Sequence, residues 1–213
     1  MALIQSGADS TLLTVDPTFK AARVVIKPDE MLGAYQVSSA TGAITTVAAN
    51  GPIFSFRWAP NNSTVCVIKR ISVGFVCTTA FTTAQQMGFG VVMARSFSGS
   101  DSGGTAITLT GNNQKYRTSL ATSSVTDSRI STTAALTAGT RTLDAQAIGT
   151  NYFWVAGAGT SLTQTDLISY DANDYPIVLA NNEGFIITNL VLMGAAGVGT
   201  AVVNVEWFEA NAY

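Results

Sequence analysis

The chain has 213 residues, of which 47% are hydrophobic and only 11% are charged, and its formal net charge is −2. About a quarter of the residues are charged in typical soluble domains, so this composition favours a surface of uncharged polar residues that other subunits partly cover. Because the sequence contains no basic arm and no Lys/Arg cluster, it argues against nucleic-acid binding.

This length predicts one large domain whose core needs no metal or disulfide. We expect residues 1–16 to form an N-terminal arm and residues 17–213 to form a single β-sandwich domain. The arm lacks the positive start and continuous apolar core of a secretory signal peptide. The longest near-apolar stretch, residues 190–205, is too short and too often interrupted by glycine for a membrane span. We therefore expect no membrane partner and folding in a cytoplasm.

The N-terminal part of the chain predicts an arm followed by short strands. The first strand should follow Pro17, and two more should lie within residues 32–49. Residues 50–52 (Asn-Gly-Pro) predict a break, and residues 54–58 alternate as an amphipathic strand. Four apolar residues of the arm fit no strand pattern, so we expect a neighbouring subunit to cover them: Leu3, Ile4, Leu12 and Leu13.

The longest strand signal covers residues 64–79. Val65, Val67 and the odd-numbered residues from Ile71 to Cys77 share one parity, and Lys69 interrupts the pattern, which predicts a bulge or two segments. The only two cysteines, Cys66 and Cys77, would lie roughly 35 Å apart on one straight strand. We therefore expect both to be buried, reduced and unpaired.

The middle of the chain predicts a turn or short helix at residues 81–86, a strand at 87–97, and then a polar stretch from Ser98 to Thr142. This stretch is rich in Ser, Thr and Gly, and short strands are expected at residues 105–110 and 129–136. A disordered linker is the competing interpretation. The isolated Ile and Leu residues favour ordered, extended structure on the surface.

Residues 152–155 predict another strand, and residues 156–174 predict a loop with a helical turn at Leu162 to Ile168. The sheet resumes at Pro176 to Ala180. Residues 186–193 and 202–208 predict two buried strands joined by a small-residue loop, with Val203, Val205 and Trp207 facing the core. Together these segments predict an all-β protein, an antiparallel sandwich that is most simply a jelly roll with long Ser/Thr/Gly-rich loops.

The sequence indicates no catalytic, cofactor-binding or metal-binding residue, and it contains no histidine to act as a poised base. Asp166, Asp171 and Asp174 lie close together in a polar segment and could offer oxygen ligands to Ca²⁺. The segment lacks the Gly and the closing Glu of an EF-hand loop, and turn formation is the commoner reason for such a string. Whether this loop binds an ion is left open.

Two further patterns have ordinary structural explanations. Residues 99–104 are rich in glycine, but no lysine or helix signal follows them, which argues against a phosphate cradle. Trp58, Trp154 and Trp207 could line a sugar site. Each occupies a strand-like position, which favours core packing for all three.

Segments from the start, middle and end of the chain resemble a family of uncharacterised virion structural proteins of tailed bacteriophages and prophages. The similar segments are residues 12–17 (LLTVDP), 101–106 (DSGGTA), 110–113 (TGNN), 180–185 (ANNEGF) and 203–207 (VNVEW). The resemblance implies a virion protein, and capsid decoration or cement proteins are often similar in size and in jelly-roll character. It implies no catalytic residues.

We therefore expect a capsid decoration or cement protein that binds the shell as a homo-oligomer, is not an enzyme, and is located in the virion. Its partners would be the major capsid protein or other virion proteins. One alternative is a tail, collar or fibre subunit with receptor-binding loops, which the Ser/Thr-rich stretches suit. Another is a glycan-binding or glycan-cleaving β-sandwich, for which the sequence shows no cluster of paired carboxylates.

Overall fold

A computed structural model describes residues 31–171 and 174–211. Within these residues the chain contains thirteen strands and no helix, so the predicted all-β class is confirmed. The arm at residues 1–16 and the strand expected after Pro17 lie outside the described residues. No helix in the described part of the chain is long and apolar enough to cross a membrane.

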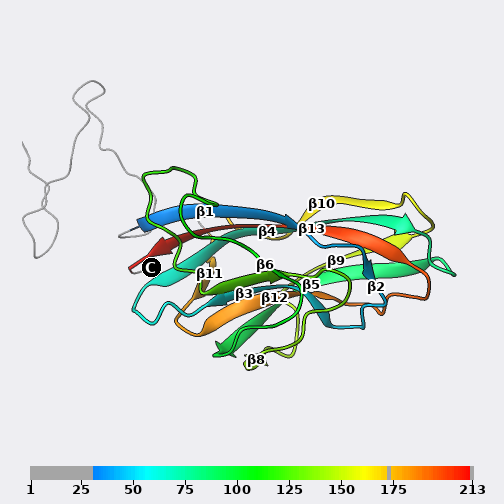
Figure 1. Cartoon of the computed structure of the whole chain (residues 1–213), viewed down its shortest axis with the longest axis horizontal. Helices are drawn as coiled ribbons and strands as arrows, with labels where there is room; N and C mark the ends of the chain where they lie inside the picture. Colours follow the sequence, from blue (N-terminus) through cyan, green and yellow to red (C-terminus); the bar gives the residue numbers. More distant parts are fainter. Residues whose placement is uncertain (1–30, 172–173, 212–213) are drawn as a thin grey trace, which may run out of the picture.

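Two antiparallel sheets pack face to face, as the sequence predicts (Figure 1). Sheet I contains, in spatial order, β1 (Met31–Ala40), β13 (Val198–Ala210), β4 (Val65–Thr79) and β10 (Ser161–Ser169), with β2 (Ile44–Thr45) beside β13 and β11 (Ile177–Leu179) beside β4. Sheet II contains β6 (Thr105–Ala106), β7 (Asp127–Ile130), β3 (Gly51–Trp58), β12 (Glu183–Asn189), β5 (Gln85–Phe97) and β8 (Arg141–Leu143), with β9 (Gly149–Val155) also beside β5.

The strand pairs are nested along the sequence. β1 pairs with β13, β3 with β12, β4 with β10, and β5 with β9. The two halves of the chain therefore run back along each other like one long hairpin. As predicted, the C-terminal strand is held inside a sheet, since β13 lies between β1 and β4.

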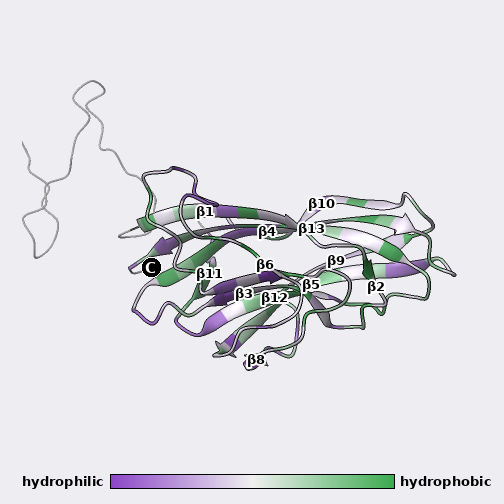
Figure 2. Ribbon diagram, viewed as in Figure 1, coloured by the Kyte–Doolittle hydropathy of each residue, from purple (hydrophilic) through white to green (hydrophobic). Residues whose placement is uncertain are grey.

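Alternate residues of the strands fill the space between the sheets, and hydrophobic and hydrophilic bands follow one another along the ribbons (Figure 2). Trp207 lies at the centre of an aromatic cluster. Its ring stacks on Tyr35 with centroids 5.5 Å apart and meets the edge of Phe56 at 5.2 Å. Only 1% of Trp207 is exposed, so its predicted role as a core anchor is confirmed.

The predicted irregularity at Lys69 is a β-bulge. Glu206 of β13 pairs with Arg70 and Trp207 pairs with Ile68, which leaves Lys69 as an extra residue. An extra residue reverses the side-chain alternation of a strand.

The bulge corrects the parity that the sequence suggested for the first half of β4. Before the bulge the core-facing residues are Cys66 and Ile68, whereas after it they are Ile71 and the odd-numbered residues up to Cys77. Val67 is buried but lies outside the core cluster. Both cysteines are buried and free, as predicted.

The polar stretch between β5 and β9, residues 98–148, is ordered, so the interpretation as a disordered linker is wrong. We call this segment the excursion. On β12, Phe185 belongs to the core cluster, and Ile186 and Thr188 therefore point outward. Both outward residues are nevertheless buried, at 1% and 2% exposure. The first residues of the excursion, 98–100, lie over this face, where Arg57 of β3 binds them, whereas residues 114–116 run along β1 of sheet I. The excursion contains only short strands, at residues 105–106, 127–130 and 141–143.

One local prediction of helix is wrong, and a second segment forms a bend and not a helix. The helical turn expected at residues 162–168 is strand β10, which pairs along β4 from Arg70 to Val76. Pairing with the exposed edge of a long strand overrides the weak helical spacing of its apolar residues. The segment at residues 81–86 contains no helix, and β5 already begins at Gln85.

Candidate functional site

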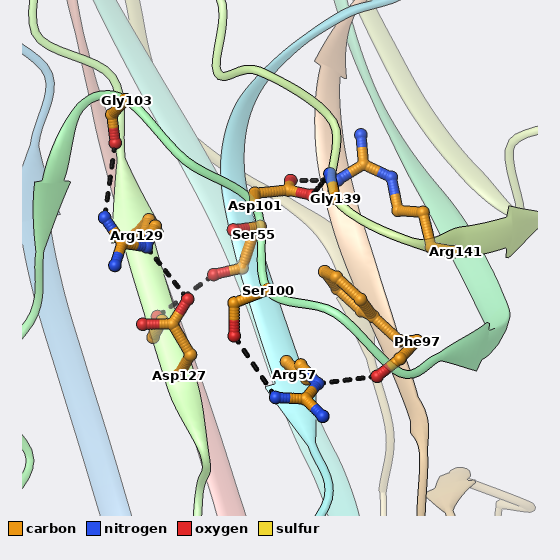
Figure 3. A network of polar contacts seen from close by, with 11 residues as sticks. Ser55, Arg57, Phe97, Ser100, Asp101, Gly103, Asp127, Arg129, Gly139 and Arg141 are labelled. Carbon is orange, nitrogen blue, oxygen red and sulfur yellow. Dashed lines mark hydrogen bonds and ion pairs between the residues drawn. The ribbon is translucent and has the colours of Figure 1, made fainter.

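The excursion is fastened to sheet II by a buried ion pair between Asp101 and Arg141 (Figure 3). Their side chains are 0% and 4% exposed. The backbone N–H of Gly139 donates to the Asp101 carboxylate at 2.8 Å, and the Arg141 guanidinium lies 5.5 Å above the Phe97 ring. These contacts join the two ends of the excursion.

Arg57 of β3 holds the first residues of the excursion in place. Its Nε donates to the carbonyl of Phe97 at 2.6 Å, and its other nitrogens donate to the carbonyl of Ser98 at 2.7 Å and to Ser100 Oγ at 3.2 Å. In the glycine-rich residues 99–104, a Cβ at Gly104 would lie 2.3 Å from the carbonyl oxygen of Ile130. This segment is therefore built for close packing against its neighbours.

A second buried carboxylate, Glu209, ties the excursion to sheet I. It accepts hydrogen bonds from Ser123 Oγ at 2.7 Å, from the backbone N–H of Ser124 at 3.0 Å, and from Trp207 Nε1 at 3.3 Å. Burial raises the pKa of Glu209 above its ordinary value of 4.5, and these hydrogen bonds oppose the rise. Sequence reasoning missed this residue because the predicted strand ended at residue 208, although Glu209 shares the parity of the core residues Val205 and Trp207.

The two thiols lie in the apolar core. Burial raises the pKa of Cys66 well above its ordinary value, and the nearby charge of Glu209 raises it further. Burial also raises the pKa of Cys77. Because the thiolate is the reactive form, these pKa shifts favour inert structural cysteines.

The three aspartates that suggested a calcium loop make different contacts and do not form one site. Asp166 is on β10, where its carboxylate pairs with Arg70 at 3.2 Å. The Asp174 carboxylate accepts a hydrogen bond from the backbone N–H of Asp171 at 2.9 Å, which is turn formation. The described residues contain no group of three or more His, Cys, Asp or Glu side chains that could hold a metal ion.

The tryptophans separate into two kinds. Trp58 and Trp207 are core residues, at 0% and 1% exposure, but the prediction of core packing is wrong for Trp154, which is 61% exposed. On β9 the inward aromatic is instead Phe153, whose ring lies 5.4 Å from Phe75. The run Tyr-Phe-Trp-Val is apolar at every position, so its alternation could not be read from the sequence.

Tyr152 and Trp154 form an aromatic face on the outer side of β9. Tyr152 is 51% exposed, and its ring covers Gly88 of β5 so closely that a Cβ there would lie 2.5 Å from it. Ile148, just before β9, is 45% exposed. Neither ring of the aromatic face stacks on another ring among the described residues.

A band of polar side chains crosses the outer side of sheet I. Arg70 pairs with Asp166 at 3.2 Å and with Glu206 at 3.7 Å. Next to Glu206, Tyr116 donates its hydroxyl to Gln36 Oε1 at 2.9 Å. The band runs into a shallow polar pocket beside β1, which is lined by Gln36, Ser38, Gln114, Lys115 and Tyr116.

Comparison of the chain with protein-family models, with curated proteins and with solved structures finds no match. Two outer surfaces of the described residues carry exposed side chains suited to binding, the aromatic face and the polar pocket.

Proposed function

We propose that this protein is a bacteriophage virion structural protein, a capsid decoration or cement protein that binds and stabilises the shell as a homo-oligomer. The observation that carries the proposal is the aromatic face, where Tyr152 and Trp154 remain 51% and 61% exposed. Tyr and Trp are enriched among the residues that dominate binding energy at protein interfaces. An exposed aromatic pair on a chain of low charge favours a protein partner, here the major capsid protein or another virion protein.

The strand order supports the same proposal. We assign the sandwich to the jelly-roll type because its nested antiparallel pairs fall in the two sheets in turn. The pairs β1–β13 and β4–β10 lie in sheet I, and the pairs β3–β12 and β5–β9 lie in sheet II. Jelly rolls recur in viral capsid domains and in lectins. The fold contributes analogy alone, since one fold hosts many functions.

The interior groups support a role without catalysis. The buried Asp101 carboxylate is paired with Arg141, and the buried Glu209 carboxylate is occupied by three donor groups. Burial raises the pKa of both thiols above the ordinary value, which lowers their reactivity. These titratable groups serve the fold, and we propose that the protein is not an enzyme.

The test is to locate and count the protein in particles purified from a host that carries its gene. Quantitative mass spectrometry should give a copy number close to that of the shell protein. A copy number far below that of the shell protein would favour a tail, collar or fibre subunit. Absence from the particles would contradict the proposal.

The aromatic face can be tested on shells stripped of this protein. The double variant Tyr152→Ser/Trp154→Ser should lose binding to the shells and keep its melting temperature. Tyr175→Ser is the matched control, because Tyr175 is 94% exposed on a loop before β11. Equal binding by the double variant and the control would exclude the aromatic face as the docking surface.

The arm provides an independent test of assembly. We propose that removal of residues 1–16 weakens oligomerisation or shell binding more than it weakens the fold, because its four leucine and isoleucine residues need a partner surface. Light scattering and thermal melts of the truncated and full-length proteins measure the two effects. Unchanged assembly with a lower melting temperature would place the arm in the protein's own core.

A further inference from the structure

We infer that the polar pocket beside β1 binds a carbohydrate. Backbone hydrogen bonds hold one wall of the pocket in place. The backbone N–H of Gln36 donates to the carbonyl of Gln114 at 2.9 Å, and the N–H of Tyr116 donates to the carbonyl of Ala34 at 3.2 Å. Residues 114–116 therefore run along the edge of β1, beside the outward side chains of Gln36 and Ser38. This inference is independent of the virion role proposed above.

The side chains that line the pocket match the chemistry of a sugar. Gln36 and Gln114 offer amide donors and acceptors, Ser38 offers a hydroxyl, and Lys115 offers an ammonium group. Tyr116 adds an aromatic ring and is 54% exposed. A sugar has hydroxyls that both donate and accept, and apolar C–H faces that pack against such a ring. With one cation and no aliphatic side chain, the lining suits neither a polyanion nor an apolar ligand.

Tyr116 is held in position by its neighbours. Its hydroxyl donates to Gln36 Oε1 at 2.9 Å, which leaves the amide NH₂ of Gln36 without a partner among the described residues. Burial raises the pKa of the Tyr116 hydroxyl, and the charge of Glu206 raises it further. The ring and the free amide are thus fixed together at one side of the pocket.

An unpaired acceptor lies next to the pocket. Asn204 of β13 pairs across the strands with Ser38, a lining residue. The Oδ1 atom of Asn204 is covered and has no hydrogen-bond partner among the described residues. Buried acceptors are normally satisfied, so this oxygen marks the strand pair at Ser38 as a place that lacks a donor.

The aromatic face lacks this combination. Tyr152 lies over Gly88, and Trp154 and Ile148 are the exposed apolar residues nearest to it in the chain. The pocket instead joins one ring to several convergent polar groups, the arrangement that fixes the orientation of small ligands. The geometry therefore places the carbohydrate site at Tyr116, away from the three tryptophans.

The experiment is a screen of the full-length protein on an array of neutral and acidic oligosaccharides that includes bacterial surface glycans. Isothermal titration calorimetry then measures the affinity for the saccharide that binds best. Gln36→Ala and Tyr116→Ala should each weaken binding by about tenfold or more, which corresponds to the loss of one good contact. Tyr116→Phe keeps the ring and should weaken binding less than Tyr116→Ala. Trp154→Ala should bind as the wild type does.

Thermal melts of all four variants check that the fold is intact. Failure of the wild-type protein to bind any saccharide on the array would overturn the inference. So would binding that Trp154→Ala abolishes and Gln36→Ala leaves unchanged, because the sugar would then lie on β9. Loss of shell binding in the Gln36→Ala variant without saccharide binding by the wild type would make this surface a protein interface instead.

Discussion

On the outer side of sheet I, charged residues lie in the open: Arg70 and Asp166 are each 45% exposed and face no covering layer. On the outer side of sheet II, Asp101 and Arg141 are 0% and 4% exposed within the excursion, residues 98–148. An ion pair between Arg and Asp thus occurs once in a solvent-exposed site and once in a buried site. An ion pair covered by the excursion is therefore sealed from water on sheet II, whereas the pair on sheet I remains open to solvent.

The largest expected effect is on the buried pair. Arg141→Met removes one partner and leaves the Asp101 charge unpaired within the excursion, which typically costs about 3–5 kcal/mol of unfolding free energy. Urea unfolding measures the change. The matched control is Arg95→Met, whose partner Asp144 lies 2.9 Å away at an exposed site, and it should cost less than about 1 kcal/mol. Equal costs for the two variants would mean that the excursion does not seal the pair from water.

A similar loss is expected in the main core. Trp207→Ala should cost about 3–5 kcal/mol, because the ring is buried between Tyr35 and Phe56. Trp154→Ala, on the aromatic face, should change stability by no more than about 0.5 kcal/mol. Thermal and urea unfolding of the two variants compare a core tryptophan with a surface one. An unchanged melting temperature for Trp207→Ala would contradict the position of β13.

An intermediate effect is expected at Glu209, where the excursion meets sheet I. Glu209→Ala leaves the donors from Ser123, Ser124 and Trp207 without an acceptor, at a cost of about 1–3 kcal/mol. The folded-state pKa of Glu209 is raised above its ordinary value of 4.5. The stability it contributes is therefore fully present below pH 4.5 and is lost as the pH rises through the folded pKa.

Glu209→Gln tests the sign of this pH dependence. The variant should gain stability relative to the wild type as the pH rises from 4.5 to neutrality, because its amide does not ionise. Unfolding free energies at several pH values measure the difference. A wild type that instead gained on the variant with rising pH would show that the three hydrogen bonds outweigh burial.

The smallest effect is expected at the exposed band. Arg70→Gln should cost less than about 1 kcal/mol, because Arg70 and its partner Asp166 are each 45% exposed. The cost should shrink further in high salt, whereas that of Arg141→Met should change little. Unfolding at low and high ionic strength separates the two. A large, salt-insensitive cost at Arg70 would remove the distinction between the two faces.

Much of the fold follows from local patterns. The alternation at Phe54 to Trp58 and at Val203 to Trp207 predicts the two strands and the side of each that is buried. The apolar residues on both predicted sides are buried in the structure. The bulge at Lys69 was indicated by one charged residue in an apolar run. The direction in which it shifts the earlier residues depends on pairing with β13, which local sequence does not show.

The candidate surfaces were harder to predict. Trp154 lies in a run that is apolar at each position, so only the pairing of β9 with β5 decides that it faces outward. Tyr116 and Gln36 are 80 positions apart in the chain and meet because residues 114–116 run along β1. Contacts of this kind between distant segments leave no local spacing to recognise.

The amino-acid sequence alone predicts the all-β class, the central strands, the unpaired cysteines and the core position of Trp207. Alternating polarity fixes these features, because each residue's preference for core or solvent acts locally along a strand. The burial of Asp101 and Glu209, the exposure of Trp154 and the ordered path of residues 98–148 follow from the three-dimensional packing. A side chain is buried only where other segments pack against it, and local sequence does not show which distant segments these are.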